Sequence, residues 1–417
     1  MNTRKLLLST VLLSAVFASC KKDKSSDPAP VVQENISGEV SGTWAKNGTY
    51  KVSGSIIIPE GKSLTIEEGA TVIMVDSNAK PEIIVKGNLY CTGTAANPIH
   101  LTIPEEMKGG NQWGGLWGGI IAAPTCAELL LEYTEMDYGG AVTTEESASV
   151  KAGLYKAAAG EHVPALYVSN VSGKLVVQNC AVHNFREDGF YIEGGSVILD
   201  HNKFYTTGLD NGDAINIKSG VLADVAYNFV YSPNTNGLKL SNSGDRTPQA
   251  YVIGYNNTVV NAGWRRPTTK GGSIWLEKTV HVDLYNNLLA NDRYGVKRDK
   301  GNPEDSRSIV GYTLYFGANQ TCVDQFQPSD EILTGVNDMV STTVGDNDPK
   351  FVNYPTSTDM ANGTFNTAWD FHLQAGSPAL NAGKTGFSRH FSTAITMNGM
   401  AYTSPEPATY IGAYGTN

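Results

Sequence analysis

The sequence predicts an all-β solenoid, in which short strands stack coil upon coil along one axis. One observation is a tetrapeptide that recurs between residues 163 and 300, as ALYV at Ala165, GFYI at Gly189, AINI at Ala214, GLKL at Gly237, SIWL at Ser273 and GVKR at Gly295. A second is an asparagine that recurs in VVQNCAV, LDHNKF, VAYNFV, GYNNTV and LYNNLL. Successive copies are mostly spaced in the twenties, the range in which self-similarity indicates one coil per repeat.

The tetrapeptide supplies one strand per coil, and its alternation separates two sets of side chains. Side chains alternate faces along a strand, so the apolar members are expected to point inward: Leu166, Val168, Phe190, Ile192, Ile215, Ile217, Leu238, Leu240, Ile274, Leu276 and Val296. The residues between them form what we call the outward stripe: Tyr167, Tyr191, Asn216, Lys239, Trp275 and Lys297. Stacking brings neighbours in this stripe about 4.8 Å apart.

The recurring asparagines are each followed two positions later by a hydrophobic residue, and they are Asn179, Asn202, Asn228, Asn257 and Asn287. A short amide side chain tolerates turn geometry and bonds to neighbouring main chain. We therefore expect these residues to occupy the same turn of successive coils, where their amides can bond to one another. Asn202, Asn228 and Asn257 in particular should form one stack of buried side chains.

Other segments extend or interrupt the solenoid. Between residues 40 and 101, glycine and proline punctuate β-branched runs, which predicts the first coils. Residues 141–163 break the period and are rich in alanine, so we expect an excursion with a short helix, where binding loops often occur. The repeat fades after Asn302, where Ser377, Pro378 and Gly383 suit the start and stop of a further helix. The C-terminal segment is expected to cap the open end of the solenoid.

The N-terminus carries targeting information. Arg4 and Lys5 precede an apolar run that ends at Phe17, which is typical of a signal peptide. The small residues before Cys20 resemble a bacterial lipobox, which implies lipidation of Cys20 and an outer-membrane lipoprotein at the cell surface or the periplasmic face. The alternative is an ordinary secreted protein that is cut nearby. The predicted organisation is signal peptide 1–19, flexible tether 20–35, β-helix 36–303, and C-terminal coils and cap 304–417.

Charge and cysteine content exclude some functions. The formal net charge of -10 argues against nucleic acid as a partner, because nucleic-acid binding needs a basic field. Four cysteines, Cys91, Cys126, Cys180 and Cys322, show no metal-binding or redox spacing, and we assign them no chemistry. Basic residues gather between positions 265 and 307, whereas the rest of the chain is acidic, which favours an anionic ligand in that part.

The asparagine column and the strand pattern resemble the right-handed parallel β-helix superfamily, whose best-known members are pectate lyases. The resemblance implies the right-handed winding. It extends to four segments that are similar, in order, to pectate lyase landmarks: VILDHNKF at Val197, GDAINIKSG at Gly212, VIGYNNTVVNAGWRRPTTK at Val252 and HVDLYNN at His281. It therefore also implies calcium-dependent eliminative cleavage of a uronate polysaccharide, in which Ca²⁺ neutralises the uronate carboxylate.

The resemblance assigns roles to individual residues. Asp200 matches the aspartate of the family's Asp-His pair, and Asp210 or Asp213 falls where calcium-binding aspartates occur. Arg265 and Lys270 match the first and last basic residues of the RxPxxR motif, with lysine in place of the final arginine. Arg265 would then be the base, Lys270 would bind substrate, and Asp200, Asp210 and Asp213 would hold Ca²⁺.

Two positions depart from the lyase pattern. The family's substrate-binding lysine of the next coil aligns with Asn236, and its second calcium aspartate aligns with Asn216. Both departures replace a charged group by a neutral amide, so they remove part of the charge on which the lyase chemistry depends.

Three hypotheses for function remain open at this point. The first is an envelope lipoprotein whose outward stripe binds a polysaccharide, preferably anionic, without cutting it, because aromatic faces stack on sugar rings and lysine pairs with uronate or sulfate groups. The same hypothesis includes a role as an adhesion or scaffold module. The second is the calcium-dependent lyase. The third is a glycosidase that uses paired carboxylates among Asp200, Asp210 and Asp213. Against all three stands the alternative that the stripe is a solvated sheet surface with scattered aromatic residues.

Overall fold

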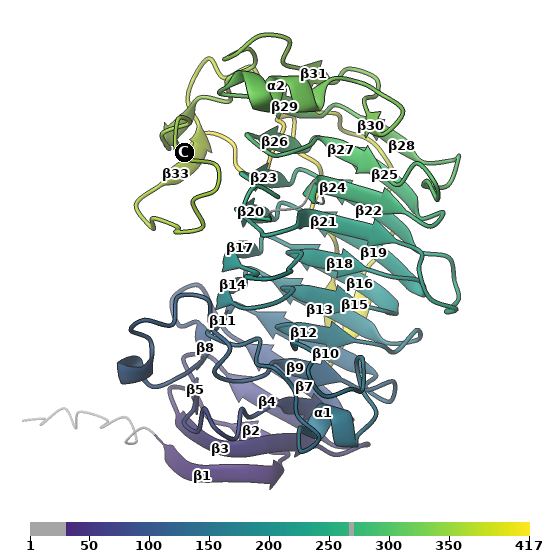
Figure 1. Ribbon diagram of the computed structural model, residues 1–417. Coiled ribbons are helices and arrows are strands. Elements are labelled where there is room, and N and C mark those ends of the chain that lie inside the picture. Colours follow the sequence, from purple (N-terminus) through teal and green to yellow (C-terminus); the bar gives the residue numbers. More distant parts are fainter. Residues whose placement is uncertain (1–30, 267–270) are drawn as a thin grey trace, which may run out of the picture.

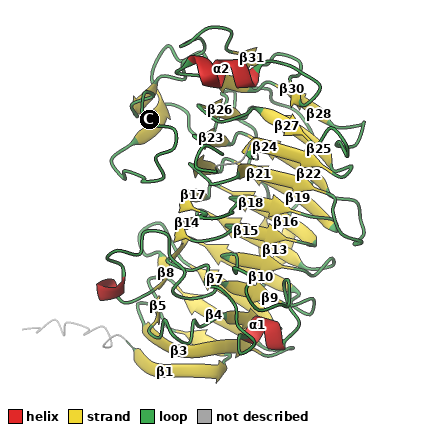
Figure 2. Ribbon diagram, viewed as in Figure 1, coloured by secondary structure: helices red, strands yellow, loops and turns green. Residues whose placement is uncertain are grey.

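The computed structural model describes residues 31–266 and 271–417, which wind into a tall β-solenoid (Figure 1). Strands dominate it, and the few helical segments lie outside the stacked sheets (Figure 2). Parallel pairing starts where β1 (Val32–Glu39) joins β3 and continues to β31 (Met339–Val340), so the coils run beyond residue 303. The predicted signal peptide and Cys20 lie outside the described residues. Within the described ranges, no helix is long and apolar enough to cross a membrane.

The strands form three ladders, one for each face of the solenoid, and every pairing within them is parallel except that of β27 with β30. The stripe face, which carries the outward stripe, consists of β3 (Thr49–Ile58), β6 (Ile83–Val85), β9 (Ile120–Ala122), β12 (Leu166–Val168), β15 (Phe190–Ile192), β18 (Ile215–Ile217), β21 (Asn236–Ser241), β24 (Gly272–Glu277), β27 (Val296–Arg298) and β30 (Ile332–Leu333).

The second face, which we call the ladder face, starts directly after the asparagine turn. It consists of β5 (Thr71–Met74), β8 (Ile99–Thr102), β11 (Thr134–Asp137), β14 (Ala181–Phe185), β17 (Lys203–Thr207), β20 (Phe229–Tyr231), β23 (Thr258–Val260), β26 (Leu288–Ala290), β29 (Leu314–Phe316) and β31. The broad face is a separate sheet of β2 (Gly42–Trp44), β4 (Ser63–Glu67), β7 (Asn88–Thr92), β10 (Glu128–Glu132), β13 (Lys174–Gln178), β16 (Gly195–Asp200), β19 (Val221–Ala226), β22 (Tyr251–Tyr255), β25 (His281–Tyr285) and β28 (Ile309–Gly311).

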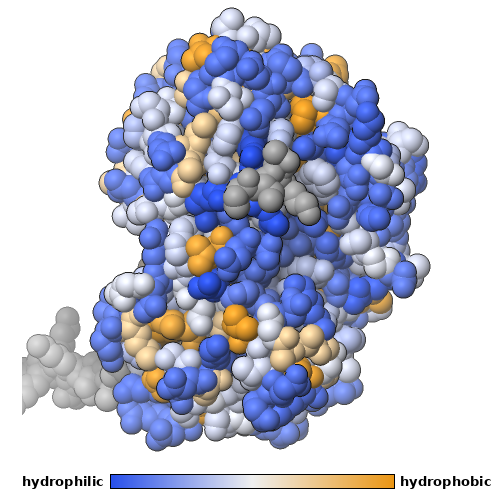
Figure 3. All heavy atoms as spheres, viewed as in Figure 1, coloured by the Kyte–Doolittle hydropathy of each residue, from blue (hydrophilic) through white to orange (hydrophobic). Residues whose placement is uncertain are grey.

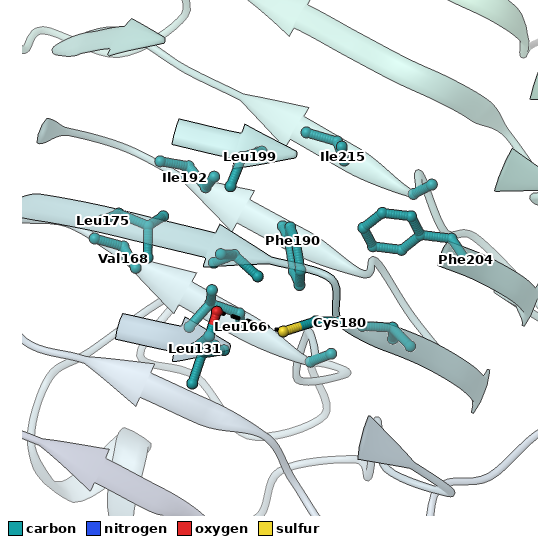
Figure 4. Close-up of a cluster of buried hydrophobic side chains, with 14 of the residues drawn as sticks. Leu131, Leu166, Val168, Leu175, Cys180, Phe190, Ile192, Leu199, Phe204 and Ile215 are labelled. Carbon is teal, nitrogen blue, oxygen red and sulfur yellow. Dashed lines mark hydrogen bonds between the residues drawn. The ribbon is translucent and has the colours of Figure 1, made fainter. Parts of the chain in front are cut away.

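The core fills the space between the three faces, and the predicted inward residues of the tetrapeptides are confirmed. Leu166, Phe190 and Ile215 follow one another in register, and all three are fully buried. Figure 4 shows them beside Leu175 and Leu199 of the broad face. Since branched and aromatic side chains pack well on pleated surfaces, these repeats favour strands and fill the solenoid with apolar layers.

The asparagine stack is confirmed for Asn202, Asn228, Asn257 and Asn287. Each amide nitrogen donates a hydrogen bond to the amide oxygen of the next residue, over 3.0, 3.0 and 2.9 Å in order. Each of the first three also donates its main-chain N–H to the same oxygen of the next residue. The stack therefore satisfies buried main-chain groups at a turn that every coil repeats.

The expectation for Asn179 is wrong by one position. Cys180 pairs with the stack, because its N–H donates to the amide oxygen of Asn202 over 3.0 Å. Asn179 belongs to the preceding column, where Asn256 and Asn286 also have positive φ angles, of 56°, 52° and 57° in order. Asparagine tolerates this left-handed conformation, so it is favoured in two adjacent columns, and the spacing alone does not distinguish them.

The remaining elements are η1 (Glu105–Met107), α1 (Ala148–Lys151), α2 (Gln320–Phe326), and the antiparallel pairs β32 (Phe351–Asn353) with β33 (Asp370–Leu373) and β34 (Ile395–Met397) with β35 (Met400–Tyr402). The expected short helix in the excursion is therefore confirmed as α1. The helix expected at Ser377 is wrong, because residues 377–383 form turns in which Ser377 Oγ accepts only the N–H of Ala379.

The end of the solenoid is covered, as expected, but by α2 and not by the last residues of the chain. The end of the solenoid is covered by α2, whose Phe326 is fully buried and contacts the ring of Tyr315 edge-on. The chain after residue 350 instead returns along the sides, and its yellow trace passes the sheets in Figure 1. It covers the ladder face with Phe371 and Ile411, and it covers the broad face with Phe391. A distant end of the chain thus seals two of the three faces.

Candidate functional site

The outward stripe lies on successive strands as predicted. Tyr167, Tyr191, Asn216, Lys239, Trp275 and Lys297 pair in this order, each with the next. The stripe is not uniformly accessible, however, since Tyr167 is only 4% exposed and its hydroxyl donates to Glu193 over 2.7 Å. The accessible part of the stripe therefore starts at Tyr191.

Two adjoining hollows follow the accessible part of the stripe, and together we call them the groove. The first is lined by residues that include Glu187, Asp188, Tyr191, Asp213, Lys218 and Arg266. The second includes Asn236, Trp275, Glu277, Lys297 and Asp299, and both hollows share Thr235 and Lys239. Figure 3 views this side of the molecule, where hydrophilic residues surround a hollow across the middle of the solenoid.

Asp188 and Asp213 form a carboxylate pair at one end of the groove. Both precede a tetrapeptide by one residue, so they occupy the same position in successive coils. Asp188 accepts the N–H of Asp213 over 2.7 Å, and Asp213 accepts the N–H and the side-chain amide of Asn236 over 3.0 and 2.7 Å. The amide of Asn216 bridges the pair, since its nitrogen donates to Asp188 over 2.9 Å and to Asp213 over 3.3 Å.

Glu187 joins this pair and changes its electrostatics. Burial and the neighbouring Asp188 carboxylate raise the pKa of Glu187, and burial and Asp213 raise the pKa of Asp188. Among the described residues, one carboxylate oxygen of Glu187 and the amide oxygen of Asn216 are buried without a hydrogen-bond partner. Buried polar atoms normally have partners, so these two unpaired acceptors add to the cost of burying the carboxyl groups at this end of the groove.

Cationic and aromatic groups follow along the groove. Lys239 lies 3.7 Å from the Glu277 carboxylate, and the indole N–H of Trp275 donates to the same carboxylate over 2.9 Å. Lys297 lies over the rings of Tyr294 and Trp275, 3.9 and 5.8 Å from their centroids. Burial and the nearby Lys239 charge lower the pKa of Lys218. The groove therefore has carboxyl groups at one end and, at the other, ammonium groups that lie beside an indole ring and near the Glu277 carboxylate.

A family profile described as "Pectate-lyase like beta helix domain" matches residues 35–370. The chain belongs to this family. Neither a search of curated proteins nor a search of solved structures finds a match. Membership in the pectate-lyase-like family agrees with the recurring tetrapeptide and the asparagine column that predicted the fold, and with the parallel ladders of the structure.

Arg265, which the pectate-lyase resemblance singled out as the base, is not directed at the groove. The guanidinium of Arg265 donates to main-chain oxygens of Thr207, Gly208 and Ser232, over 2.6 to 2.7 Å, and it lies 4.4 Å from the centre of the Trp113 ring. Burial lowers the pKa of Arg265 to about 10. Its neighbour Arg266 lines the groove instead, bound to the Thr235 hydroxyl over 2.7 Å. Lys270 lies outside the described residues.

The three aspartates predicted to bind calcium do not form one site. Asp200 ends β16 on the broad face, where it accepts from Gln178 over 2.8 Å. Asp210 is exposed and lies 3.3 Å from Arg186, whereas Asp213 lines the groove. No group of three or more His, Cys, Asp or Glu residues in the described chain is arranged to hold a metal ion. These aspartates are separated because coil position, rather than closeness in sequence, decides which side chains meet.

Sequence reasoning missed Glu187, Asp188, Lys218 and Arg266. A signal for Asp188 was present: extending the tetrapeptide alignment by one column to the left places Asp188, Asp213 and Asn236 in a line. Two carboxylates and an amide at equivalent positions of consecutive coils predict a polar cluster at the start of the stripe strands. Arg266 belongs to the basic run between positions 265 and 307, but its place in the groove had no periodic signal, because it lies in the long connection between β23 and β24.

Proposed function

We propose that the protein is a cell-envelope lipoprotein whose groove binds a linear polysaccharide that contains uronate units. The observation that carries this proposal is the continuity of the groove over five consecutive strands of the stripe face, from Tyr191 on β15 to Lys297 on β27. Four steps of about 4.8 Å span about 19 Å, which suits a segment of a polymer better than a compact metabolite.

The chemistry of the groove supports this ligand class. The Trp275 ring provides an apolar face for a sugar ring, and Lys239 and Lys297 provide cations for uronate carboxylates. At the other end, the carboxylates of Glu187, Asp188 and Asp213 accept hydrogen bonds from sugar hydroxyls rather than pair with ligand anions. A uronate polymer carries hydroxyls and carboxylates along its length, and it can satisfy both ends.

Calorimetry with a panel of uronate and neutral polysaccharides tests the proposal. Binding of a uronate polymer should weaken in Trp275→Ala through lost ring stacking and in Lys239→Met through a lost charge-assisted contact. Lys62→Met, which removes an exposed lysine far from the groove in an early coil, is the matched control and should bind as the wild type does. Equal affinity in all three variants, or no binding of any polymer, would refute the proposal.

A second candidate function is glycoside hydrolysis, favoured by the carboxyl groups at one end of the groove. Glycosidases need one protonated carboxyl group as acid and one carboxylate as base or nucleophile. The raised pKa of Glu187 suits the acid, which protonates the glycosidic oxygen, while Asp188 and Asp213 suit the base that activates water. Hydrolysis would release reducing ends, and Asp213→Asn should abolish their release while the polymer still binds.

The same incubations address the calcium-dependent lyase alternative. Elimination produces an unsaturated sugar that absorbs ultraviolet light, and it should require added Ca²⁺. The separation of Asp200, Asp210 and Asp213, and the main-chain partners of Arg265, give this alternative less support than the carboxylate pair gives hydrolysis. Both reactions create reducing ends, but only elimination also creates the unsaturated sugar. Calcium-dependent growth of ultraviolet absorbance in step with the new reducing ends would therefore reverse that preference.

Lipidation of Cys20 is the part of the proposal that concerns localisation. The lipobox-like sequence that precedes it supports an anchored protein whose tether, which is shorter than expected because β1 begins at Val32, holds the solenoid away from the outer membrane. Cys20→Ser should shift the protein from the membrane fraction to the soluble fraction. Unchanged membrane retention would remove Cys20 as the anchor and leave the groove proposal intact.

A further inference from the structure

The row of outward positions continues beyond the groove, but its chemistry changes. Past Tyr191 and Tyr167, the next positions in register are Ile121 on β9 and Ile84 on β6. Both isoleucines are buried, although they point away from the solenoid core. The excursion of residues 141–163 covers them, with Leu154 and Val163 in the same apolar cluster. The row is therefore sealed by protein on one side of Tyr191.

Tyr155 stands at the boundary between the sealed part and the groove. Its ring meets the rings of Tyr167 and Tyr191 edge-on, with centroids 5.4 Å away in both cases. The first hollow is bounded there by Tyr155 and Lys156. Tyr155 adopts a positive φ of 57°, which is uncommon for an aromatic residue and is maintained only by its surroundings. The ring therefore forms an end wall of the groove.

The excursion that carries this end wall is attached to the solenoid by buried hydrogen bonds. Ser149 of α1 donates its N–H and its hydroxyl to the two carboxylate oxygens of Glu82, over 2.7 and 2.6 Å. The start and end of the excursion also pair with each other through Val142 and His162. The wall is consequently a built part of the fold rather than a segment that swings open.

The far end of the groove has a different cover. There Lys297 and Asp299 line the second hollow, and Lys297 lies 3.4 Å from Glu331, whose side chain is 47% exposed. A half-exposed carboxylate can move aside for a ligand, whereas a buried apolar cluster cannot. The two ends of the groove thus differ in accessibility, although they belong to the same row of strands.

We infer that the groove takes the end of a glycan chain, with the terminal sugar against Tyr155 and Tyr191 and the rest of the chain extending toward Lys297. This inference rests on the proposed function. A chain that continued in both directions would have to pass through the cluster of Ile121, Leu154 and Val163. The carboxylates of Glu187, Asp188 and Asp213 then surround the terminal unit, so any hydrolysis at this site releases units from a chain end.

Binding stoichiometry at different chain lengths tests the inference. Size-fractionated polygalacturonate, in short and long fractions of known molar concentration, is titrated into the protein with calorimetric detection. An end-binding groove should saturate at the same number of protein molecules per chain in every fraction. A number that rises in proportion to chain length would overturn the inference and leave the proposed binding function standing. Absence of binding to any fraction would refute both.

A variant of the wall provides a second measurement. Tyr155→Ala removes the surface against which the terminal sugar packs, and it should weaken binding of the shortest fraction about tenfold, equivalent to about 1.4 kcal/mol. Lys151→Ala, on the exposed side of the same excursion, is the matched control and should change nothing. Thermal unfolding of both variants verifies that they fold. Full affinity of folded Tyr155→Ala for the shortest fraction would contradict the inferred position of the chain end.

Discussion

The stripe face and the ladder face are built from the same coils, but the outer surface of the first lines a groove, whereas that of the second is covered by protein. On the stripe face, the outward residues of β15, β18, β21 and β24 are Tyr191, Asn216, Lys239 and Trp275, which line the groove. On the ladder face, each strand from β20 to β29 presents outward residues that belong to a buried apolar cluster: Phe229, Tyr231, Val260, Leu288, Ala290, Leu314 and Phe316. The returning C-terminal chain covers them.

This difference shows that the outward side chains of a solenoid strand decide whether its face is covered by protein or stays accessible. A parallel strand buried on both sides is a continuous apolar run, as in FVY, TVV and LLA of β20, β23 and β26. A strand with one accessible side alternates, as in FYI of β15 and IWL of β24, whose middle residues are partly exposed. The first kind recruits a cover from the same chain, and the second leaves a surface for a ligand.

The largest effect should come from a change on the covered face. Phe229→Ala should lower the free energy of unfolding by about 3 to 5 kcal/mol, because the ring is buried against Phe371, 4.5 Å between centroids, and its loss leaves a cavity. The matched change Trp275→Ala on the stripe face should cost less than about 1 kcal/mol. Urea unfolding measures both. Equal losses would mean that the two faces do not differ in the way described.

The C-terminal chain is also held on the broad face, and Asp224 anchors it. This buried carboxylate accepts the main-chain N–H groups of His390 and Phe391 over 3.1 and 2.9 Å and the Ser404 hydroxyl over 2.6 Å. Asp224→Ala leaves three donors unpaired, and it should cost about 3 kcal/mol. Limited proteolysis should then cut between residues 384 and 412. Protection equal to that of the wild type would show that the apolar contacts alone hold the cover.

The asparagine stack sits at the turn between the broad face and the ladder face. Asn228→Ala removes bonds to Asn202, Asn257 and the main-chain oxygen of Leu199, and it should lower the free energy of unfolding by about 2 kcal/mol. Asn78→Ala, at an exposed turn, should have little effect. If Asn228→Ala lowers the free energy of unfolding no more than Asn78→Ala does, neighbouring groups or water replace the amide.

The smallest effect concerns the pH dependence contributed by the groove. Because the pKa of Glu187 is raised on folding, the folded protein holds this proton over a range in which the unfolded chain has lost it, and stability falls as pH rises through that range. Glu187→Gln has no ionisable group at this position, so it does not lose stability in this way as pH rises. The variant should therefore gain stability relative to the wild type as pH increases from about 4.5, as measured by urea unfolding. A difference that does not vary with pH would contradict the buried carboxyl group.

The groove was only partly predictable. The period of the tetrapeptide was enough to place Tyr191, Asn216, Lys239, Trp275 and Lys297 on neighbouring strands, because register in a regular solenoid follows from spacing. The burial of Tyr167 was not predictable in the same way. It depends on Leu154 and Tyr155, which lie in a segment without periodicity, so their position over the stripe is a result of tertiary packing.

By itself the sequence determined the class of fold, the inward layers and the turn at which asparagines stack, because these depend on alternation and on a period that is written along the chain. Only the tertiary structure decided which carboxylates meet. Asp188 and Asp213 lie 25 residues apart and share the amide of Asn216, whereas Asp210, three residues from Asp213, faces solvent. Covering the outer faces also required the folded chain, since residues beyond 350 return to strands formed up to 270 positions earlier. Contacts between aperiodic segments follow from packing and not from spacing.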